Sequence, residues 1–358
     1  MTDTKEKIRI GILYGGLSAE HDVSVMSATN VMNALSPERY DAVPIYITKT
    51  GKWLLSRYED GVLDRPSEGS FLCFLPGGHG RLIALEADGS CIELPKIDIL
   101  FPVLHGLPGE DGAVQGLAET ALLPLAGCGI AGSANALDKD LAKRLLSAAD
   151  VPTARALTIH PGKVPGFEEV AQALGLPVFV KPARQGSSVG VSKVTSASEY
   201  DTALQEGFRH DSKLLAEEFI EGREIECAVL EDPDGGLFVS RCGEIVPAES
   251  HGFYTYDAKY VDGDGAALIV PADLPGKLED EIRDTAAKAF QALGCDGMAR
   301  VDFFLCKDGR FLVNELNTIP GFTDISMYSK VMAVSGVGYA EVIDRLVAHG
   351  LARAKRNL

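Results

Sequence analysis

An alternation of apolar strands and helical segments most restricts the fold of this 358-residue chain. Residues 8–14 are a continuous apolar run, followed by two glycines and a helical pattern over 22–35. Further strands are predicted at residues 42–47 and 97–104, and a helix over 111–122 follows the second of them. Because strands alternating with helices form parallel sheets, we expect a doubly wound, Rossmann-like α/β sheet in this part.

The chain is too long for one ordinary hydrophobic core, so its length predicts two or three domains. The strands and helices fall into three blocks, and we expect domains at residues 1–136, 137–217 and 218–358. Residues 48–95 interrupt the first pattern, and residues 249–269 are long enough for a lid. In the second and third domains, helices are expected over residues 138–149, 166–174, 197–207, 275–293 and 338–350, and strands over 154–160, 177–183, 190–194, 213–220, 225–231 and 237–245.

Charge and composition exclude several classes of function. The formal net charge of −17 argues against binding to nucleic acid or to an anionic membrane surface. No apolar run approaches the ~20 residues of a membrane span, and the polar N-terminus lacks the apolar segment of a signal peptide. The seven cysteines are scattered without a CxxC pair, so neither a disulfide framework nor a zinc site is indicated. These features favour a cytoplasmic protein.

A predicted hairpin near the C-terminus places charged residues opposite one another. Asp308 and Gly309 separate two apolar strands, and a two-residue loop at this point pairs residues whose numbers sum to 617. Asp302 then faces Glu315 and Arg300 faces Asn317, all on one face because side chains alternate. The core face would pair Val301 with Leu316 and Leu305 with Leu312.

Facing carboxylates at Asp302 and Glu315 repel each other unless a positive charge lies between them. Magnesium is a hard cation that prefers oxygen ligands, and it usually binds together with phosphates. The hairpin therefore indicates a nucleotide-handling enzyme. The alternative is a solvated sheet face on which the charges point apart.

A Gly/Ser-rich segment, residues 185–190, follows a predicted strand that ends at Lys181. Such a loop can present backbone N–H groups and hydroxyls, including Ser187 and Ser188, to phosphate oxygens. It is not a Walker A loop, because the lysine precedes the glycines and a strand follows. An ordinary hairpin turn is the alternative.

Acidic residues close the second domain, at Glu217, Glu218 and Glu224. Strand alternation sends Glu217 and Glu218 to opposite faces. Acids at a domain boundary could accept hydrogen bonds from an adenine amine and from ribose hydroxyls. A solvated run of charges is the alternative.

Two loops are expected at the carboxyl edge of the first sheet, where α/β proteins bind ligands. His105 begins a glycine-rich segment at residues 105–116, and residues 15–20 follow the first strand. Glu20 is therefore a candidate partner for a substrate cation. Helix capping by Ser18 and Glu20 is the rival interpretation.

Residues 127–132 match the dinucleotide fingerprint GxGxxG and raise the alternative of an NAD-dependent oxidoreductase. The context is poor, because the preceding strand is short and contains Pro124. The next helix is also expected only near residue 138. A turn that crosses between domains is the preferred interpretation.

Taken in order, residues 15–20, 105–116, Lys181 with 186–190, and 314–321 resemble the D-alanine–D-alanine ligases of the ATP-grasp superfamily. The resemblance covers nearly the whole chain. It implies an α/β fold, α+β in the ATP-binding part, with ATP held between the central and C-terminal domains. ATP would phosphorylate one D-alanine, and the amine of a second would attack the acyl phosphate.

The resemblance also assigns roles to residues. Glu20 would hold the first ammonium, with hydrogen bonds to Ser187 and Tyr260, and Arg300 and the Gly321 N–H would stabilise the oxyanion. Substrate would contact His105, Ser326 and Met327. ATP would contact Lys139, Lys181, Ser188, Glu217, Glu218, Glu224 and Lys259. The two magnesium ions, which manganese could replace, would be held by Asp302, Glu315 and Asn317.

Position 218 departs from the family pattern, since some members carry Lys where this chain has Glu218. The resemblance further implies a homodimer. Tyr260 in the expected lid favours an amine nucleophile over D-lactate, and it excludes D-serine less firmly. A nucleotide-binding regulator without chemistry is a further alternative, but the presence of both expected metal carboxylates and of Arg300 argues against it.

Overall fold

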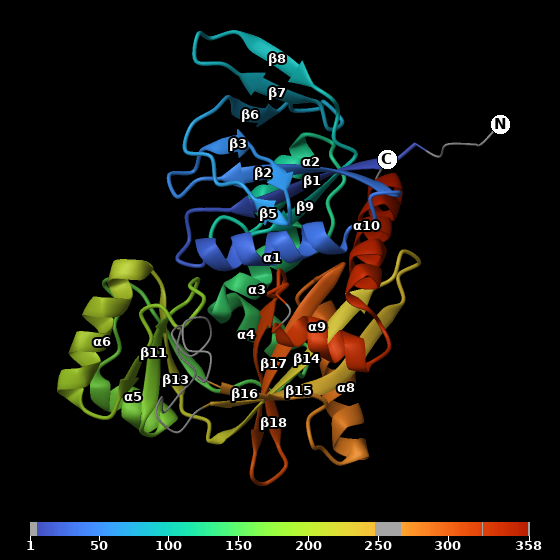
Figure 1. Ribbon diagram of the computed structural model, residues 1–358. Coiled ribbons are helices and arrows are strands. Elements are labelled where there is room, and N and C mark those ends of the chain that lie inside the picture. Colours follow the sequence, from blue (N-terminus) through green and yellow to red (C-terminus); the bar gives the residue numbers. More distant parts are fainter. Residues whose placement is uncertain (1–5, 248–265, 324, 357–358) are drawn as a thin grey trace.

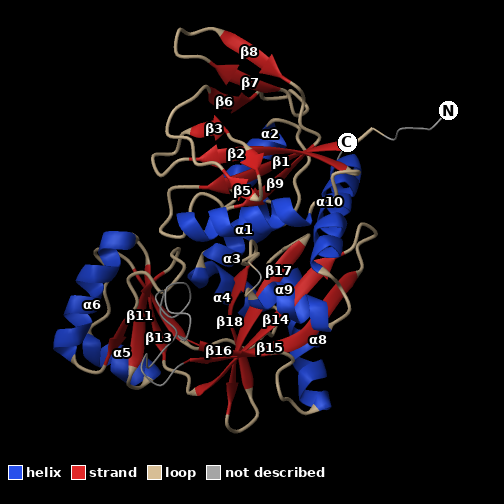
Figure 2. Cartoon of the chain, viewed as in Figure 1, coloured by secondary structure: helices blue, strands red, loops and turns tan. Residues whose placement is uncertain are grey.

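The computed structural model describes residues 6–247, 266–323 and 325–356, and it contains three main sheets (Figures 1 and 2). The first has seven strands in the order β8-β7-β6-β3-β2-β1-β9. Its strands are β1 (Ile8–Gly15), β2 (Tyr40–Ile47), β3 (Trp53–Leu55), β6 (Phe71–Phe74), β7 (Leu82–Leu85), β8 (Cys91–Leu94) and β9 (Ile99–Val103). A separate two-stranded ribbon joins β4 (Tyr58–Glu59) to β5 (Val62–Leu63).

The predicted parallel sheet is confirmed for β2, β1 and β9. The other four strands come from residues 53–94, which the sequence left unassigned, and they pair antiparallel. Helices α1 (His21–Ala34) and α2 (Ala113–Thr120) pack on this sheet. The carboxyl ends of β1 and β9 therefore open at one edge, as expected.

The second sheet is antiparallel, with the order β10-β13-β11-β12. Its strands are β10 (Ala156–Ile159), β11 (Val178–Pro182), β12 (Ser192–Val194) and β13 (Leu214–Glu218). Helices α5 (Phe167–Leu174) and α6 (Ala197–His210) cover one face, where alternate residues such as Val178 and Val180 are fully buried. Alternation therefore turns Phe179 and Lys181 to the opposite face.

The third sheet has five strands in the order β16-β15-β14-β17-β18. They are β14 (Gly222–Glu231), β15 (Leu237–Pro247), β16 (Ala266–Ile269), β17 (Met298–Cys306) and β18 (Phe311–Asn317). Helices α4 (Lys139–Ala148) and α8 (Gly276–Ala292) pack on its apolar face. Helices α9 (Met327–Val334) and α10 (Tyr339–Arg356) link β14 and β15 to the first sheet (Figure 1).

The hairpin β17–β18 differs from the prediction at its turn. Cys306, not Lys307, faces Arg310, so the loop has three residues and ends at Gly309 with a φ of 85°. This register pairs Leu305 with Phe311 and not with Leu312. A bulge between Phe303 and Asp302 then restores the predicted pairs Asp302–Glu315, Val301–Leu316 and Arg300–Asn317.

The GxGxxG segment is occupied by the protein itself. Helix α3 (Ile130–Leu137) begins directly after Gly129, earlier than the helix expected near residue 138. The Gly129 N–H donates to the Asp296 carboxylate, and the Gly127 carbonyl accepts from Arg353. A carboxylate therefore lies where a dinucleotide would place its pyrophosphate. A Cβ on Gly132 would lie 2.5 Å from Cys128 Sγ, so this glycine serves packing.

Among the described residues, no helix is both long and apolar enough to cross a membrane. The division at residues 136 and 217 stays a prediction.

Candidate active site

A cavity of about 840 Å³ lies where loops of the first sheet meet the second and third sheets. Its walls contain residues from the carboxyl edge of the first sheet, the Gly/Ser loop, the hairpin and the start of α9. The predicted site residues that line it are Glu20, His105, Lys139, Ser187, Arg300, Glu315, Asn317, Gly321, Ser326 and Met327.

Three carboxylates form one row across the third sheet. Glu226 of β14 pairs with Asp302 of β17, which in turn pairs with Glu315 of β18. Side chains in such a row have Cβ atoms about 5 Å apart and repel one another when charged. Sequence reasoning found two of the three. It missed Glu226 because the β14–β17 pairing joins segments far apart in the chain.

Side-chain cations neutralise this row. Arg300 Nε and Nη2 each donate to the Asp302 carboxylate at 2.7 Å, and the same Nε lies 2.9 Å from Glu226 Oε2. Lys139 Nζ lies 3.3 Å from Glu315 Oε2. Asn317 Nδ2 also donates to Asp302. Arginine and lysine thus pair with Asp302 and Glu315, and the magnesium ion predicted between these two carboxylates stays a prediction.

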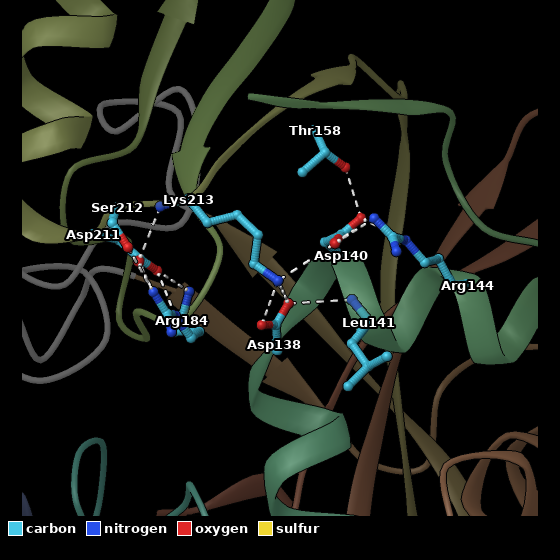
Figure 3. A network of polar contacts seen from close by, with 9 residues as sticks. All are labelled: Asp138, Asp140, Leu141, Arg144, Thr158, Arg184, Asp211, Ser212 and Lys213. Carbon is cyan, nitrogen blue, oxygen red and sulfur yellow. Dashed lines mark hydrogen bonds and ion pairs between the residues drawn. The ribbon is translucent and has the colours of Figure 1, made fainter. Parts of the chain in front are cut away.

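A polar network surrounds Asp138 and Asp140 at the start of α4 (Figure 3). Asp138 caps the helix by accepting from the Leu141 N–H, and Lys213 Nζ lies 2.5 Å from the same carboxylate. Lys213 also lies 3.4 Å from Asp140. The two residues that flank Lys139 in the chain are thus tied to Lys213, directly before β13, and Lys139 Nζ itself donates to the Gln185 carbonyl at 2.8 Å.

The same network fixes the start of the Gly/Ser loop (Figure 3). The Arg184 N–H and guanidinium both donate to Asp211. Ser187 and Ser188 have φ angles of 51° and 59°, a region that non-glycine residues rarely adopt. The loop extends to the first sheet, where the Ser187 hydroxyl donates to Glu20 at 2.5 Å. The structure thus brings together two residues separated by 167 positions.

Glu217 lies between two lysines on the inner face of the second sheet. Lys181 Nζ lies 2.5 Å from its Oε1 and Lys143 Nζ lies 2.7 Å from its Oε2. Burial opposes the charge on Glu217, but the two lysines outweigh it and lower its pKa below the usual value. Sequence reasoning missed Lys143, although its spacing of four from Lys139 places both on one helix face.

His105 and Glu110 lie beside Glu20. Burial lowers the pKa of His105, whose Nδ1 lies 3.1 Å from the Ile319 carbonyl. Burial, together with the nearby Glu20, raises the pKa of Glu110 to about 8, against a hydrogen bond from the Gly106 N–H. Glu110 lines the cavity but was not singled out in the sequence. Its position near Glu20 in the folded protein is what identifies Glu110 as a residue of the site.

The start of α9 forms the opposite wall. Ser326 is the N-cap residue, and its Oγ accepts from the Thr323 N–H at 3.0 Å. A Cβ on Gly321 would lie 2.8 Å from this oxygen, so a glycine permits the close approach. Met327 begins the helix, and its N-terminal N–H groups favour a carboxylate nearby.

Several predicted residues lie outside the cavity wall. Asp302 accepts a hydrogen bond from Arg300, and Lys181 pairs with Glu217, which does not line the cavity either. The Glu218 carboxylate accepts from both the backbone and the guanidinium of Arg155, so the structure gives it a local role. The remaining residues are Ser188 and Glu224, which do not line the cavity either, and Lys259 and Tyr260, which lie outside the described residues.

The donor set fits magnesium by its chemistry. Asp302, Glu315 and Asn317 offer the carboxylate and amide oxygens that this ion prefers. Within the described ranges, no group of three or more His, Cys, Asp and Glu side chains converges to hold a metal. Asp302 instead pairs with Arg300, and Glu315 pairs with Lys139. Both ion pairs would have to break before a metal ion could bind.

Comparisons with known proteins give one consistent result. The family model described as D-ala D-ala ligase N-terminus matches residues 9–128, and the model described as D-ala D-ala ligase C-terminus matches residues 145–348. "D-alanine--D-alanine ligase A" of Brucella suis is 65% identical over 97% of this chain and 98% of its own length. The Escherichia coli K12 protein of the same name is 45% identical, with 97% of each chain covered.

Solved structures give the same result. The D-alanine-D-alanine ligase from Coxiella burnetii is 34% identical with a TM-score of 0.85, covering 99% of this chain and 96% of its own. VanG D-Ala:D-Ser ligase from Enterococcus faecalis is 32% identical with a TM-score of 0.83, covering 96% and 100%. These ligases are ATP-grasp enzymes. The chain therefore belongs to the D-alanine–D-alanine ligase family.

Proposed function

We propose that this chain joins two molecules of D-alanine at the expense of ATP, through a D-alanyl phosphate, for the synthesis of peptidoglycan precursors. One observation carries the proposal. A single cavity gathers Glu20 for an ammonium group, Lys139 and Arg300 for phosphate and oxyanion, and two proposed metal ligands, Glu315 and Asn317. No part of this set serves hydride transfer, and the GxGxxG segment is filled by Asp296.

The first half-reaction needs two anions to meet. A carboxylate oxygen of the first D-alanine attacks the terminal phosphorus of ATP, and ADP leaves. Glu20, held by Ser187, orients the ammonium group of this D-alanine. Lys139 and Lys181 would lower the repulsion between carboxylate and phosphates, because positioning and charge neutralisation dominate phosphoryl transfer.

In the second half-reaction the amine of the second D-alanine attacks the acyl carbon, and phosphate leaves. Arg300 and the Gly321 N–H would stabilise the oxyanion that forms at this carbon. The N-terminus of α9, with Ser326 at its N-cap, would hold the second carboxylate. Tyr260 and Lys259 in the expected lid would complete the site and exclude water from the acyl phosphate.

Asp302, Glu315 and Asn317 are the residues that would hold two magnesium ions. Bound there, the ions would neutralise the phosphate charges of ATP. Manganese is expected to substitute because it accepts the same oxygen ligands. We propose that Glu315→Gln retains the fold and largely abolishes turnover. Near-normal turnover at saturating ATP and magnesium would contradict the metal assignment.

The choice of nucleophile is tested with D-alanine alone. We expect ATP-dependent phosphate release and a D-alanyl-D-alanine product without any second amino acid or hydroxy acid. Release that depends on added D-serine or D-lactate would overturn the proposal. The D-alanine–D-alanine ligases at 45–65% identity favour D-alanine over the D-serine named for the structure at 32%.

We further propose domains at residues 1–136, 137–217 and 218–358, a cytoplasmic location and a homodimer. Sedimentation velocity distinguishes a dimer from a monomer, and the mass of a single chain would contradict the dimer.

A further inference from the structure

We propose that Glu226 is a positioning residue. It would pair with the Arg300 guanidinium when Asp302 becomes a ligand of a metal ion. This inference rests on the proposed function, because it assigns a task to a carboxylate beside the proposed metal ligands. Glu226 lies in the same row as Asp302 and Glu315, and its side chain is 7% exposed. A buried third carboxylate in such a row is costly unless it has a cationic partner.

Arg300 is that cationic partner, and Glu226 shares it with Asp302. Its Nε lies 2.7 Å from Asp302 Oδ1 and 2.9 Å from Glu226 Oε2. The guanidinium also contacts the second Asp302 oxygen through Nη2. Both oxygens of Asp302 are therefore covered on the side facing Arg300. A metal ion that takes Asp302 as a ligand must compete with this contact.

Release of Arg300 from Asp302 would be unfavourable if the guanidinium had no other carboxylate at hand. Its side chain is 18% exposed, so water offers limited compensation. Glu226 already lies at contact distance and lines the same cavity. A small rotation of the guanidinium toward Glu226 would uncover Asp302 and keep the positive charge beside the reacting atoms. Glu226 thus couples metal entry to the position of Arg300.

Glu226→Asp tests this coupling, because it retains the negative charge and withdraws the carboxylate by one methylene. We expect manganese binding, followed by electron paramagnetic resonance without nucleotide, to weaken roughly tenfold, the scale of one hydrogen bond to a charged group. The fall in affinity should disappear in an Arg300→Met background, where no guanidinium has to be moved. Arg300→Met alone should bind manganese more tightly than the parent.

Glu244→Asp is the matched control, because Glu244 is a similarly buried acid of the same sheet that pairs with Arg223 away from the cavity. It should leave manganese affinity unchanged. Equal weakening in both Arg300 backgrounds, or no weakening in either, would overturn the proposal. Thermal melting of each variant shows that it is folded. Since the measurement needs no turnover, its failure is separate from a failure to form the dipeptide.

Discussion

Lys143 pairs with a buried acid of the candidate site, a role that its sequence context did not reveal. Its ammonium lies 2.7 Å from Glu217 and donates to the Ala154 carbonyl at 3.0 Å. Burial lowers its pKa, and the charge of Glu217 opposes that effect. Lys143 therefore helps to hold Glu217, and through it Lys181, on the face proposed to bind ATP.

Lys143→Met should raise the KM for ATP more than it lowers kcat, because it disturbs the Glu217–Lys181 pair and not the reacting atoms. We expect the free energy of unfolding to fall by about 1 to 3 kcal/mol. Arg209→Gln is the control, since this arginine of α6 pairs with Glu206 and its side chain is 73% exposed. Steady-state kinetics and chemical denaturation measure both effects. An unchanged KM for ATP would refute the role.

The raised pKa of Glu110 predicts that the stability of the folded protein depends on pH. Its pKa is raised from 4.5 to about 8 in the folded protein, chiefly by burial. The unfolded chain therefore releases this proton first, and the Glu110 contribution to stability falls as pH rises between 4.5 and 8. Glu110→Gln should flatten the decline across this window and melt at a higher temperature near pH 8. Parallel melting curves against pH for the two proteins would contradict the assignment.

The bulge in β18 decides which face of the third sheet Glu315 and Asn317 occupy. Asn314 is the extra residue between the pairs Phe303–Val313 and Asp302–Glu315. Deletion of Asn314 removes the extra residue, so Val313 and Glu315 become neighbours on opposite faces and Glu315 stays opposite Asp302 in a regular strand. We expect the deletion variant to keep its activity within about tenfold, and a fall of more than about 100-fold, the scale of misplaced catalytic groups, would contradict this register.

Asn314→Ala is the control for that deletion, because it retains the residue count. It should keep most of the activity and a similar melting temperature. Assays of ATP-dependent phosphate release compare the two variants. Similar losses of activity in both would show that the Asn314 side chain, and not the register, is responsible.

The hairpin also shows what sequence could predict and why. Strand alternation and the Asp308-Gly309 turn placed Asp302 opposite Glu315 correctly. The predicted loop was one residue too short, and the bulge at Asn314 compensated for that error. Loop length and bulge depend on backbone pairing energies that residue types show only weakly, as at Leu305, which was paired wrongly.

The strands and site residues that the sequence did not predict share one physical cause, which is that local residue patterns do not show them. Strands in residues 53–94 are short and antiparallel, with too few residues each for a clear periodicity. Glu226 and Lys143 reach the site through pairings between distant segments, which a single sequence does not display. Residues at strand ends, such as Glu20 and His105, were predicted because the fold class itself locates them.

At the scale of the whole molecule, three sheets contribute to one cavity. The first supplies the loops with Glu20 and His105, the second the Gly/Ser loop, and the third the row of carboxylates. The Ser187–Glu20 hydrogen bond joins the second sheet's loop to the first. With the roles proposed above, this arrangement would bring an amino acid and a phosphate donor together, as activation of a carboxylate requires.

Activation of the D-alanine carboxylate as an acyl phosphate can be measured directly by isotope transfer. The protein is supplied with ATP and with D-alanine carrying ¹⁸O in its carboxylate, and the inorganic phosphate released is analysed by mass spectrometry. Formation of an acyl phosphate predicts one ¹⁸O atom in the phosphate for each D-alanyl-D-alanine formed, because the carboxylate oxygen leaves with phosphorus. Dipeptide formed with unlabelled phosphate would contradict the account.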